Sequence, residues 1–280
     1  MTASVEAFRR DVRTAAGPSG IVEEIVHAGD KREPAALHSL FASPGRPASR
    51  PTVLFLHGKG GCGAEWRRDA VRALGLGWNV LVPELRGHPP SGGARVTYGW
   101  FEKVDLALLV EETTRRHGID PMNLGVDGCS MGSLVALHFA ALKPRPAALW
   151  LQSPFGNMAS MAVHYVHRAT LLPLVVLELP VRWAVARIDK TTGIPLSAVD
   201  PVVAARRVTA PTAIVHGEED ELVPVRFAPA VFEALAGEKS FWRVARCGHC
   251  HHADEPQAVH GAEYVRRWTD FFSAHLSSRA

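Results

Sequence analysis

A serine stands between two glycines in the segment Gly128-Cys129-Ser130-Met131-Gly132. Residues 122–126, before it, form a short apolar run typical of a buried strand. Residues 134–142, after it, form an alanine-rich apolar run typical of a helix packed on a sheet. A G-x-S-x-G motif in this context predicts a nucleophile elbow, in which the glycines permit a sharp turn and expose the serine oxygen. Because so short a motif also arises by chance, the prediction depends on an acid, a base and an oxyanion hole elsewhere in the chain.

The acid is expected to follow the serine along the chain and to precede the base. No Asp or Glu occurs between Ser130 and Glu178, but a strand predicted over residues 212–215 leads into the acidic turn His216-Gly-Glu-Glu-Asp-Glu-Leu-Val-Pro224. Such a turn is often only a solvated loop. Here one carboxylate is needed to orient an imidazole, which favours Asp220, with Glu219 as the second candidate.

The base is expected just after the last predicted strand, residues 241–244, where Gly248-His249 precedes the predicted C-terminal helix. His249 is the favoured base, and His251 and His252 remain alternatives. The same stretch, residues 247–251, matches the C-x-x-C-H signature of covalent haem attachment, and a C-x-x-C pair also occurs in redox and zinc sites. Since no second C-x-x-C and no export signal occur, we expect no metal and no cofactor.

A glycine-rich turn, His57-Gly58-Lys59-Gly60-Gly61, follows the strand predicted over residues 52–56. Its backbone N–H groups can supply half of an oxyanion hole, and the N–H of Met131 can supply the other half. Lys59 is the favoured donor and Gly60 the second. A phosphate-binding loop is not favoured, because no Lys-Ser/Thr pair follows at the required spacing. His57 itself is interpreted as a structural residue.

Short apolar runs alternate with longer amphipathic runs from residue 52 onward, which predicts a mostly parallel sheet with helices on both faces. The strands are expected at 52–56, 79–82, 122–126, 147–151, 212–215 and 241–244, and the helices at 64–74, 100–117, 131–142, 228–236 and 256–275. Two weaker strands, 21–27 and 35–41, are expected to form an antiparallel edge.

Residues 154–198 interrupt this alternation with a long apolar, helix-compatible insertion. Connections of this length usually have a function, and this one starts at the carboxyl end of a strand, where ligands bind in open α/β sheets. We interpret it as a helical lid that lines an acyl pocket, although an additional pair of core helices is the alternative. The expected substrate-binding side chains are Met158, Met161, Tyr165 and Trp183.

The chain has 280 residues, of which 47% are hydrophobic and 21% charged, with a formal net charge of +3. These values predict a single globular domain, residues 1–280, and argue against nucleic-acid binding. No apolar run is long enough for stable membrane insertion. Because no secretory signal is recognised, a cytoplasmic location is expected, with the four cysteines reduced rather than joined in a disulfide framework. An incidental disulfide between Cys247 and Cys250 is left open. The sequence leaves homo-oligomer formation open.

Four motifs in order, HGKGG, GCSMGS, HGEEDELVP and CGH, resemble those of the α/β-hydrolase superfamily from about Ala35 to the end. The passage Val82-Pro-Glu-Leu-Arg-Gly-His88 is similar to a loop of the dienelactone-hydrolase-like and prolyl-oligopeptidase-like branch. The resemblance implies an α/β-hydrolase fold with Ser130 as nucleophile, Asp220 as acid and His249 as base. Glu84 replaces the usual Asp of that loop, Pro89-Pro90 replaces a Gly, and Ser133 stands where a second Gly is common.

The expected activity is that of a serine hydrolase, which cleaves a carboxylic ester or related acyl bond of a small molecule through an acyl-enzyme. A peptidase, a thioesterase and an acyltransferase use the same triad on this fold and remain alternatives. A non-catalytic binding protein, or a metal or redox protein that uses the Cys247/Cys250 loop, is a further alternative. Labelling of Ser130 by a fluorophosphonate distinguishes the hydrolase from these last two.

Overall fold

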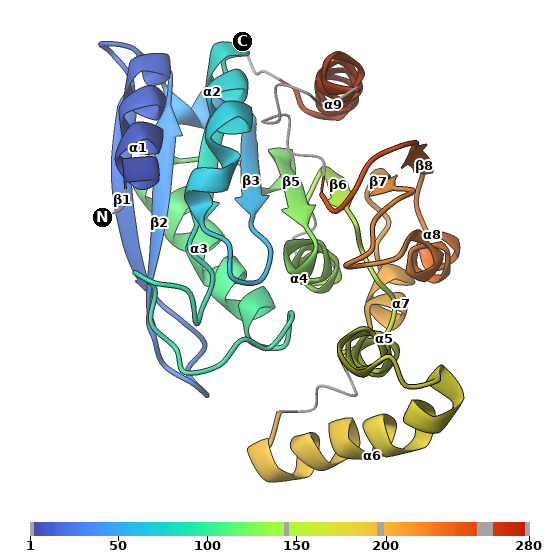
Figure 1. Ribbon diagram of the computed structural model, residues 1–280. Helices are drawn as coiled ribbons and strands as arrows, with labels where there is room; N and C mark the ends of the chain where they lie inside the picture. Colours follow the sequence, from blue (N-terminus) through green and yellow to red (C-terminus); the bar gives the residue numbers. More distant parts are fainter. Residues whose placement is uncertain (1–2, 143–145, 195–198, 251–259, 278–280) are drawn as a thin grey trace.

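The computed structural model describes residues 3–142, 146–194, 199–250 and 260–277. Its centre is an eight-stranded sheet in the order β1-β2-β4-β3-β5-β6-β7-β8 (Figure 1). The strands are β1 (Ile21–Ala28), β2 (Ala36–Ser43), β3 (Thr52–Leu56), β4 (Asn79–Pro83), β5 (Leu124–Cys129), β6 (Ala148–Gln152), β7 (Thr212–Gly217) and β8 (Lys239–Val244).

The two N-terminal strands form the antiparallel edge that the sequence predicts. β1 pairs with β2 and β2 with β4 in antiparallel register, whereas all pairs from β4 to β8 are parallel. β3 to β7 are buried on both faces, which explains why they appear in the sequence as largely apolar runs rather than as alternating ones. Their carboxyl ends meet at one edge of the sheet, where ligands bind in open α/β folds.

Helices cover both faces of the sheet. The helices are α1 (Ala3–Ala16), α2 (Arg67–Gly75), α3 (Glu102–His117), α4 (Met131–Ala140), α5 (Met158–Thr170), α6 (Leu174–Thr192), α7 (Pro201–Ala205), α8 (Pro229–Ala234) and α9 (Gly261–His275). Buried side chains of α1, α2 and α9 share one core cluster, and those of α3, α4, α7 and α8 share another. α1 was not predicted from the sequence. The predicted residues 256–259 of the last helix lie outside the described residues.

β5 begins two residues later and ends three residues later than predicted. The Asp120 side chain accepts a hydrogen bond from the backbone N–H of Met122 and caps a short 3-10 turn, Pro121–Asn123. The strand therefore starts at Leu124 and continues through Gly128 and Cys129. As a result, the motif serine follows the last strand residue directly, and α4 begins at the residue after it.

The predicted insertion consists of α5 and α6, which lie together beyond the carboxyl edge of the sheet (Figure 1). Asn157 caps α5 through a hydrogen bond from the N–H of Ser160. Most of α6 is exposed, and Leu177 is its one buried residue within the described chain. Among the described helices, none is both long and apolar enough to cross a membrane.

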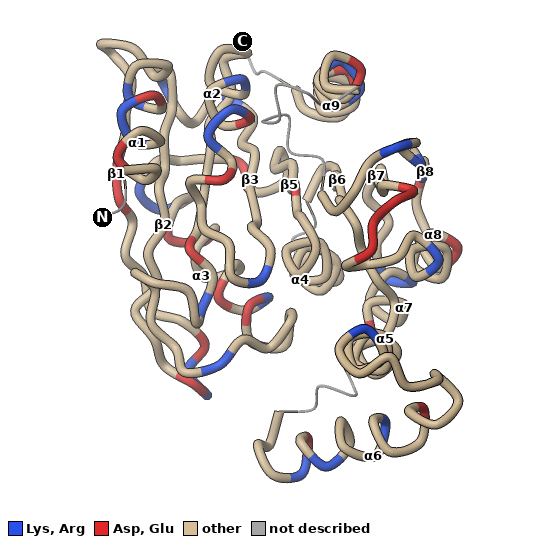
Figure 2. The backbone as a smooth tube through the Cα atoms, in the orientation of Figure 1, with Lys and Arg blue, Asp and Glu red and all other residues tan. Residues whose placement is uncertain are grey.

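Acidic and basic residues are interspersed along most of the backbone in Figure 2. The main local exception is the run Glu218–Glu221, which forms a continuous acidic segment after β7. Three of these four carboxylates belong to exposed residues, whereas Asp220 is only 3% exposed. Asp220 is therefore the one carboxylate of this run that the fold buries.

Candidate active site

Ser130 occupies a strained turn between β5 and α4, with φ 53° and ψ −115°. The turn is held by a hydrogen bond of 2.8 Å from the backbone N–H of Ser130 to the carbonyl of Gln152 in β6. A Cβ at Gly132 would lie 2.1 Å from the carbonyl oxygen of Leu56, so only glycine allows α4 to pack this closely against β3. These are the roles expected of the elbow glycines.

Ser133 packs beneath the elbow with its hydroxyl hydrogen-bonded. The Ser133 hydroxyl is fully buried and lies 2.6 Å from the carbonyl of Gly128 and 2.7 Å from that of Gln152. It therefore ties the first turn of α4 to the ends of β5 and β6. The residue adds a hydrogen-bonded link beneath the nucleophile where a glycine would provide none.

The favoured acid and base are in contact. His249 Nδ1 lies 2.7 Å from Asp220 Oδ2. Because an ionised carboxylate can only accept, Nδ1 carries the proton and Nε2 is left unprotonated on the neutral ring. Glu219, the second candidate acid, is exposed, and its backbone N–H contacts the base loop at the carbonyl of Cys247. His251 and His252, the alternative bases, lie outside the described residues.

Two further groups contact the Asp220 carboxylate. Its Oδ1 accepts a hydrogen bond of 2.7 Å from the N–H of Val223, and the imidazole of His216 lies 3.4 Å from Oδ2. Burial opposes ionisation, but the hydrogen bonds from His216 and His249 outweigh it and hold the pKa of Asp220 well below its usual range. The carboxylate is therefore ionised at neutral pH, as a residue that stabilises an imidazolium must be. The contact of His216 with this carboxylate was not predicted from the sequence.

The loop that carries His249 packs directly against the turn after β7. A Cβ at Gly217 would lie 2.2 Å from the carbonyl of Gly248, so the two backbones touch at a glycine. Hydrogen bonds of 2.9 Å run from the N–H of Glu218 to the carbonyl of Val244 and from the N–H of Glu219 to the carbonyl of Cys247. These contacts align the base loop with the acid-bearing turn.

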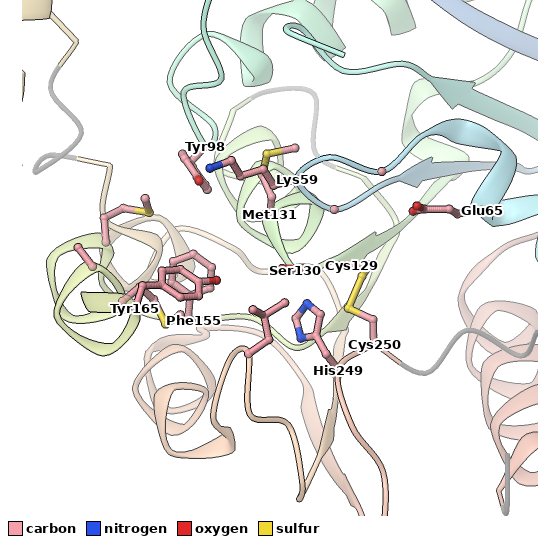
Figure 3. A pocket seen from close by; sticks show the side chains of 16 residues that line it. Lys59, Glu65, Tyr98, Cys129, Ser130, Met131, Phe155, Tyr165, His249 and Cys250 are labelled. Atoms are coloured by element: carbon pink, nitrogen blue, oxygen red, sulfur yellow. A yellow bond between two sulfur atoms is a disulfide. The ribbon is translucent and has the colours of Figure 1, made fainter. Parts of the chain in front are cut away.

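Ser130 and His249 line the same pocket, which has a volume of about 630 Å³ (Figure 3). Among the described residues, no hydrogen bond joins the Ser130 hydroxyl to His249. Such contacts are often long in the absence of substrate and shorten in the reactive complex. The pocket walls are largely apolar. The remaining lining residues are Gly58, Lys59, Gly61, Glu65, Tyr98, Cys129, Met131, Phe155, Met158, Met161, Ala162, Tyr165, Leu222 and Cys250.

Three of the four predicted substrate-binding residues line this pocket, all from α5: Met158, Met161 and Tyr165. Trp183, the fourth, does not line it. Trp183 lies on α6, is 67% exposed and is not among the lining residues. α6 packs beside α5 rather than over the serine, so its apolar side chains do not reach the pocket. Tyr98, Phe155 and Leu222 also line the pocket and were not predicted from the sequence.

The two favoured oxyanion donors both line the pocket beside Ser130. Met131 is the first residue of α4, so its N–H has no partner within the helix. Gly60, the second candidate, already donates its N–H to His88 Nε2 at 3.0 Å. Because this N–H is already bonded, Gly60 is not available as an oxyanion donor. Lys59 therefore remains the favoured donor.

The passage around Glu84 and His88, which was noted only as a family resemblance, supports this glycine loop. Both carboxylate oxygens of Glu84 lie 3.0 Å from the N–H of Gly63, and His88 holds Gly60. His57 is fully buried, bonds the carbonyl of Gly58 through Nδ1 and accepts the N–H of Leu85 at Nε2. Burial lowers its pKa to about 4. His57 is thus a neutral structural residue, as predicted.

The expectation that all cysteines are reduced is wrong. Cys129 and Cys250 form a disulfide with a Cα–Cα distance of 6.1 Å across 121 residues of sequence, whereas Cys62 and Cys247 do not. The bond lies in the pocket wall beside His249 (Figure 3). Sequence spacing drew attention to Cys247 and Cys250, but β5 and the base loop bring Cys129 to Cys250 instead.

Comparison with known proteins agrees with this fold. A family model described as the alpha/beta hydrolase fold matches residues 51–184. The chain is 28% identical over 174 residues to YqkD of Bacillus subtilis (60% of this chain, 55% of the relative). It is also 28% identical over 222 residues to the lysophosphatidylserine lipase ABHD12 of Danio rerio (77% of this chain, 55% of the relative). The matches thus cover little more than half the length of these relatives.

Among solved structures, the esterase Pf2001 of Pyrococcus furiosus superposes with a TM-score of 0.70 at 20% sequence identity. The superposition covers 92% of this chain and 94% of the esterase. An identity this low shows the fold alone. The matching family model, the strand order and the elbow between β5 and α4 lead to the same conclusion: the chain has the α/β-hydrolase fold.

Proposed function

We propose that the protein is a serine hydrolase that cleaves a carboxylic ester with an apolar acyl group. The observation that carries the proposal is the arrangement of a serine on a strained elbow and an Asp-paired histidine in one pocket wall. A relative named as a lysophosphatidylserine lipase and a similar structure named as an esterase support an ester as the bond that is cleaved.

In the proposed mechanism, His249 Nε2 takes the proton of Ser130 as the serine oxygen attacks the acyl carbonyl. Asp220 holds the proton at Nδ1 and stabilises the imidazolium that forms. The N–H groups of Lys59 and Met131 stabilise the oxyanion. His249 then protonates the leaving alcohol, and water, deprotonated by the same imidazole, releases the acid from the acyl-enzyme.

The pocket favours an apolar acyl group because α5 and neighbouring segments face Ser130 with the side chains of Met158, Met161 and Phe155. Met161 is only 1% exposed and packs with Phe155 and Leu134. An acyl chain placed against these side chains would replace water with apolar contacts. Each buried methylene contributes about 0.8 kcal/mol of binding, so longer chains should be preferred up to the length of the pocket.

The proposal is tested by a fluorophosphonate probe followed by peptide mapping. We expect the label on Ser130, at a rate that falls sharply in His249→Ala. A label elsewhere, or a labelling rate unchanged in His249→Ala, would contradict the proposed mechanism.

A series of p-nitrophenyl esters of increasing acyl length tests the pocket. Met161→Ala should lower kcat/KM for hexanoate more than for acetate, since it removes contacts that only the longer chain makes. Trp183→Ala is the matched control, because this exposed side chain lies outside the pocket, and it should change neither value. Equal losses for both esters in Met161→Ala would show that the chain does not bind along α5.

A further inference from the structure

The Cys129–Cys250 disulfide joins the two halves of the proposed catalytic machinery. Cys129 immediately precedes the nucleophile, and Cys250 immediately follows the base. Cys129 ends β5 and is 4% exposed, so its position is fixed by the core. Cys250 is half-buried and lies at the pocket wall. The bond therefore fastens the base loop to the rigid strand that carries the elbow.

The other contacts of the base loop fix it relative to a different strand. Asp220, Gly217 and Glu219 all belong to β7 or the turn after it, and their contacts align His249 with the acid. The nucleophile, however, extends from β5, and β6 lies between β5 and β7 in the sheet. The disulfide spans this separation directly.

The backbone at Cys250 is shaped to make this link. Its φ is 49°, a left-handed conformation that non-glycine residues seldom adopt. In an extended chain, consecutive side chains would point to opposite sides. Here His249 and Cys250 both line the pocket. A ring nitrogen of His249 and the sulfur atoms of Cys250 and Cys129 all lie within 4.8 Å of one another. The disfavoured turn brings both neighbours to the same side.

We propose that Cys250 is a positioning residue for His249, acting through its disulfide to Cys129, and that hydrolysis consequently depends on the thiol redox state of this pair. The inference rests on the proposed function. With the bond intact, the loop that carries His249 is tied to the strand that carries Ser130. Without it, the ring keeps its bond to Asp220 but is free to shift away from the elbow.

The redox step is a thiol–disulfide exchange with a dithiol reductant. One thiolate of the reductant attacks the Cys250 sulfur, which faces the pocket, and displaces the Cys129 thiolate, which takes up a proton. The second thiolate of the reductant then attacks the mixed disulfide and releases Cys250 as a thiol. The reductant leaves as its own disulfide, having supplied two electrons and two protons. A small disulfide oxidant reverses the sequence.

The test compares the wild-type protein with Cys250→Ser and the matched control Cys247→Ser, which removes a cysteine of the same loop outside the disulfide. Each protein is assayed with and without dithiothreitol, with thiols counted. A chelator is present throughout, because the reduced Cys129, Cys250 and His249 could capture a soft metal ion. Turnover of a p-nitrophenyl ester, fluorophosphonate labelling of Ser130 and thermal unfolding are measured on the same samples.

Reduction should lower kcat of the wild type by about 10- to 100-fold, the cost of misplacing a catalytic group by about 1 Å, with KM nearly unchanged. Re-oxidation should restore it. Cys250→Ser should show the lower kcat in both states, and Cys247→Ser should behave as the wild type. A purely stabilising cross-link would lower the unfolding temperature but leave kcat below that temperature unchanged.

The inference would be overturned if the wild type kept its full kcat once thiol counting had shown that the bond was broken. Full activity of Cys250→Ser would overturn it as well. Reversible reduction of the unmutated chain keeps the test valid even where the variant fails to fold. If oxidised wild-type protein is not labelled at Ser130 at all, the proposed hydrolase itself is wrong. The two failures are thus distinguishable.

Discussion

Replacing Asp220 with Asn probes the acid–base pair most directly. The Val223 N–H donates to Oδ1 at 2.7 Å, and His249 Nδ1 donates to Oδ2 at 2.7 Å. An asparagine has one accepting oxygen and one donating NH2 group. If the amide oxygen accepts from the fixed backbone N–H of Val223, the NH2 group faces His249 Nδ1 and must donate to it. The imidazole then carries its proton on Nε2, where it cannot accept the proton of Ser130.

The size of the effect follows from this reversed tautomer. Loss of the carboxylate removes both the correct tautomer and the charge that stabilises the imidazolium, a change that lowers kcat by about 10⁴-fold in serine hydrolases with this arrangement. At about 1.36 kcal/mol per factor of ten, this is a loss of roughly 5 kcal/mol of transition-state stabilisation. KM should change little, because Asp220 is not among the residues that line the pocket.

Turnover of a p-nitrophenyl ester under saturating conditions measures the effect, and thermal unfolding shows whether the variant is folded. Glu219→Gln is the matched control, since Glu219 is the exposed neighbour of the acid, and its kcat should equal that of the wild type. A folded Asp220→Asn protein that keeps kcat within about threefold of the wild type would refute the assignment of the acid. A large loss in Glu219→Gln instead would place the acid one residue earlier.

Two further predictions concern stability. Gly132→Ala should destabilise the fold by about 3 kcal/mol or more, because the added Cβ would lie 2.1 Å from a backbone carbonyl oxygen. The control is Gly75→Ala, whose Cβ would have no atom within 4 Å and which should be neutral or stabilising by up to about 1 kcal/mol. Urea unfolding measures both effects. Equal stability of the two variants would show that the close approach of α4 to β3 is not required. Asp127 is fully buried, and burial raises its pKa well above the usual value, although Gln152 and Trp268 donate hydrogen bonds to it. The folded chain therefore keeps a proton on Asp127 that the unfolded chain loses above about pH 4. As a result, the free energy of unfolding of the wild type, measured relative to that of Asp127→Asn, should fall as the pH rises from about 4 towards the pKa of Asp127 in the folded state. A constant difference between wild type and Asp127→Asn from pH 5 to 8 would contradict this linkage.

Local sequence signals determined much of the fold. Apolar runs at β3, β4 and β7 were recognisable because strands buried on both faces have few polar residues. The elbow was recognisable because Gly128 and Gly132 are required by close backbone approach, which no other residue type permits. The start of β5 was misplaced because the Asp120 cap competes with the strand for residues 122 and 123.

The order of serine, acid and histidine along the chain was also visible in the sequence, because each follows a predicted strand. Which carboxylate serves, however, depends on burial: Asp220 turns inward to His249, while Glu219 remains in solvent. The loss of Gly60 as an oxyanion donor likewise depends on His88, which lies 28 residues further along the chain. Neither contact has a local signal.

The tertiary structure alone decided which residues enclose the serine and which cysteines pair. Trp183 was expected in the pocket because it is apolar and lies in the insertion, yet the packing of α6 beside α5 leaves it in solvent. Cys247 and Cys250 form the obvious pair in sequence, but Cys250 bonds Cys129 across 121 residues. The type and spacing of residues along a chain indicate which chemistry each residue can perform. Which residues contact one another is decided by strand order and helix packing, because these bring distant parts of the chain together.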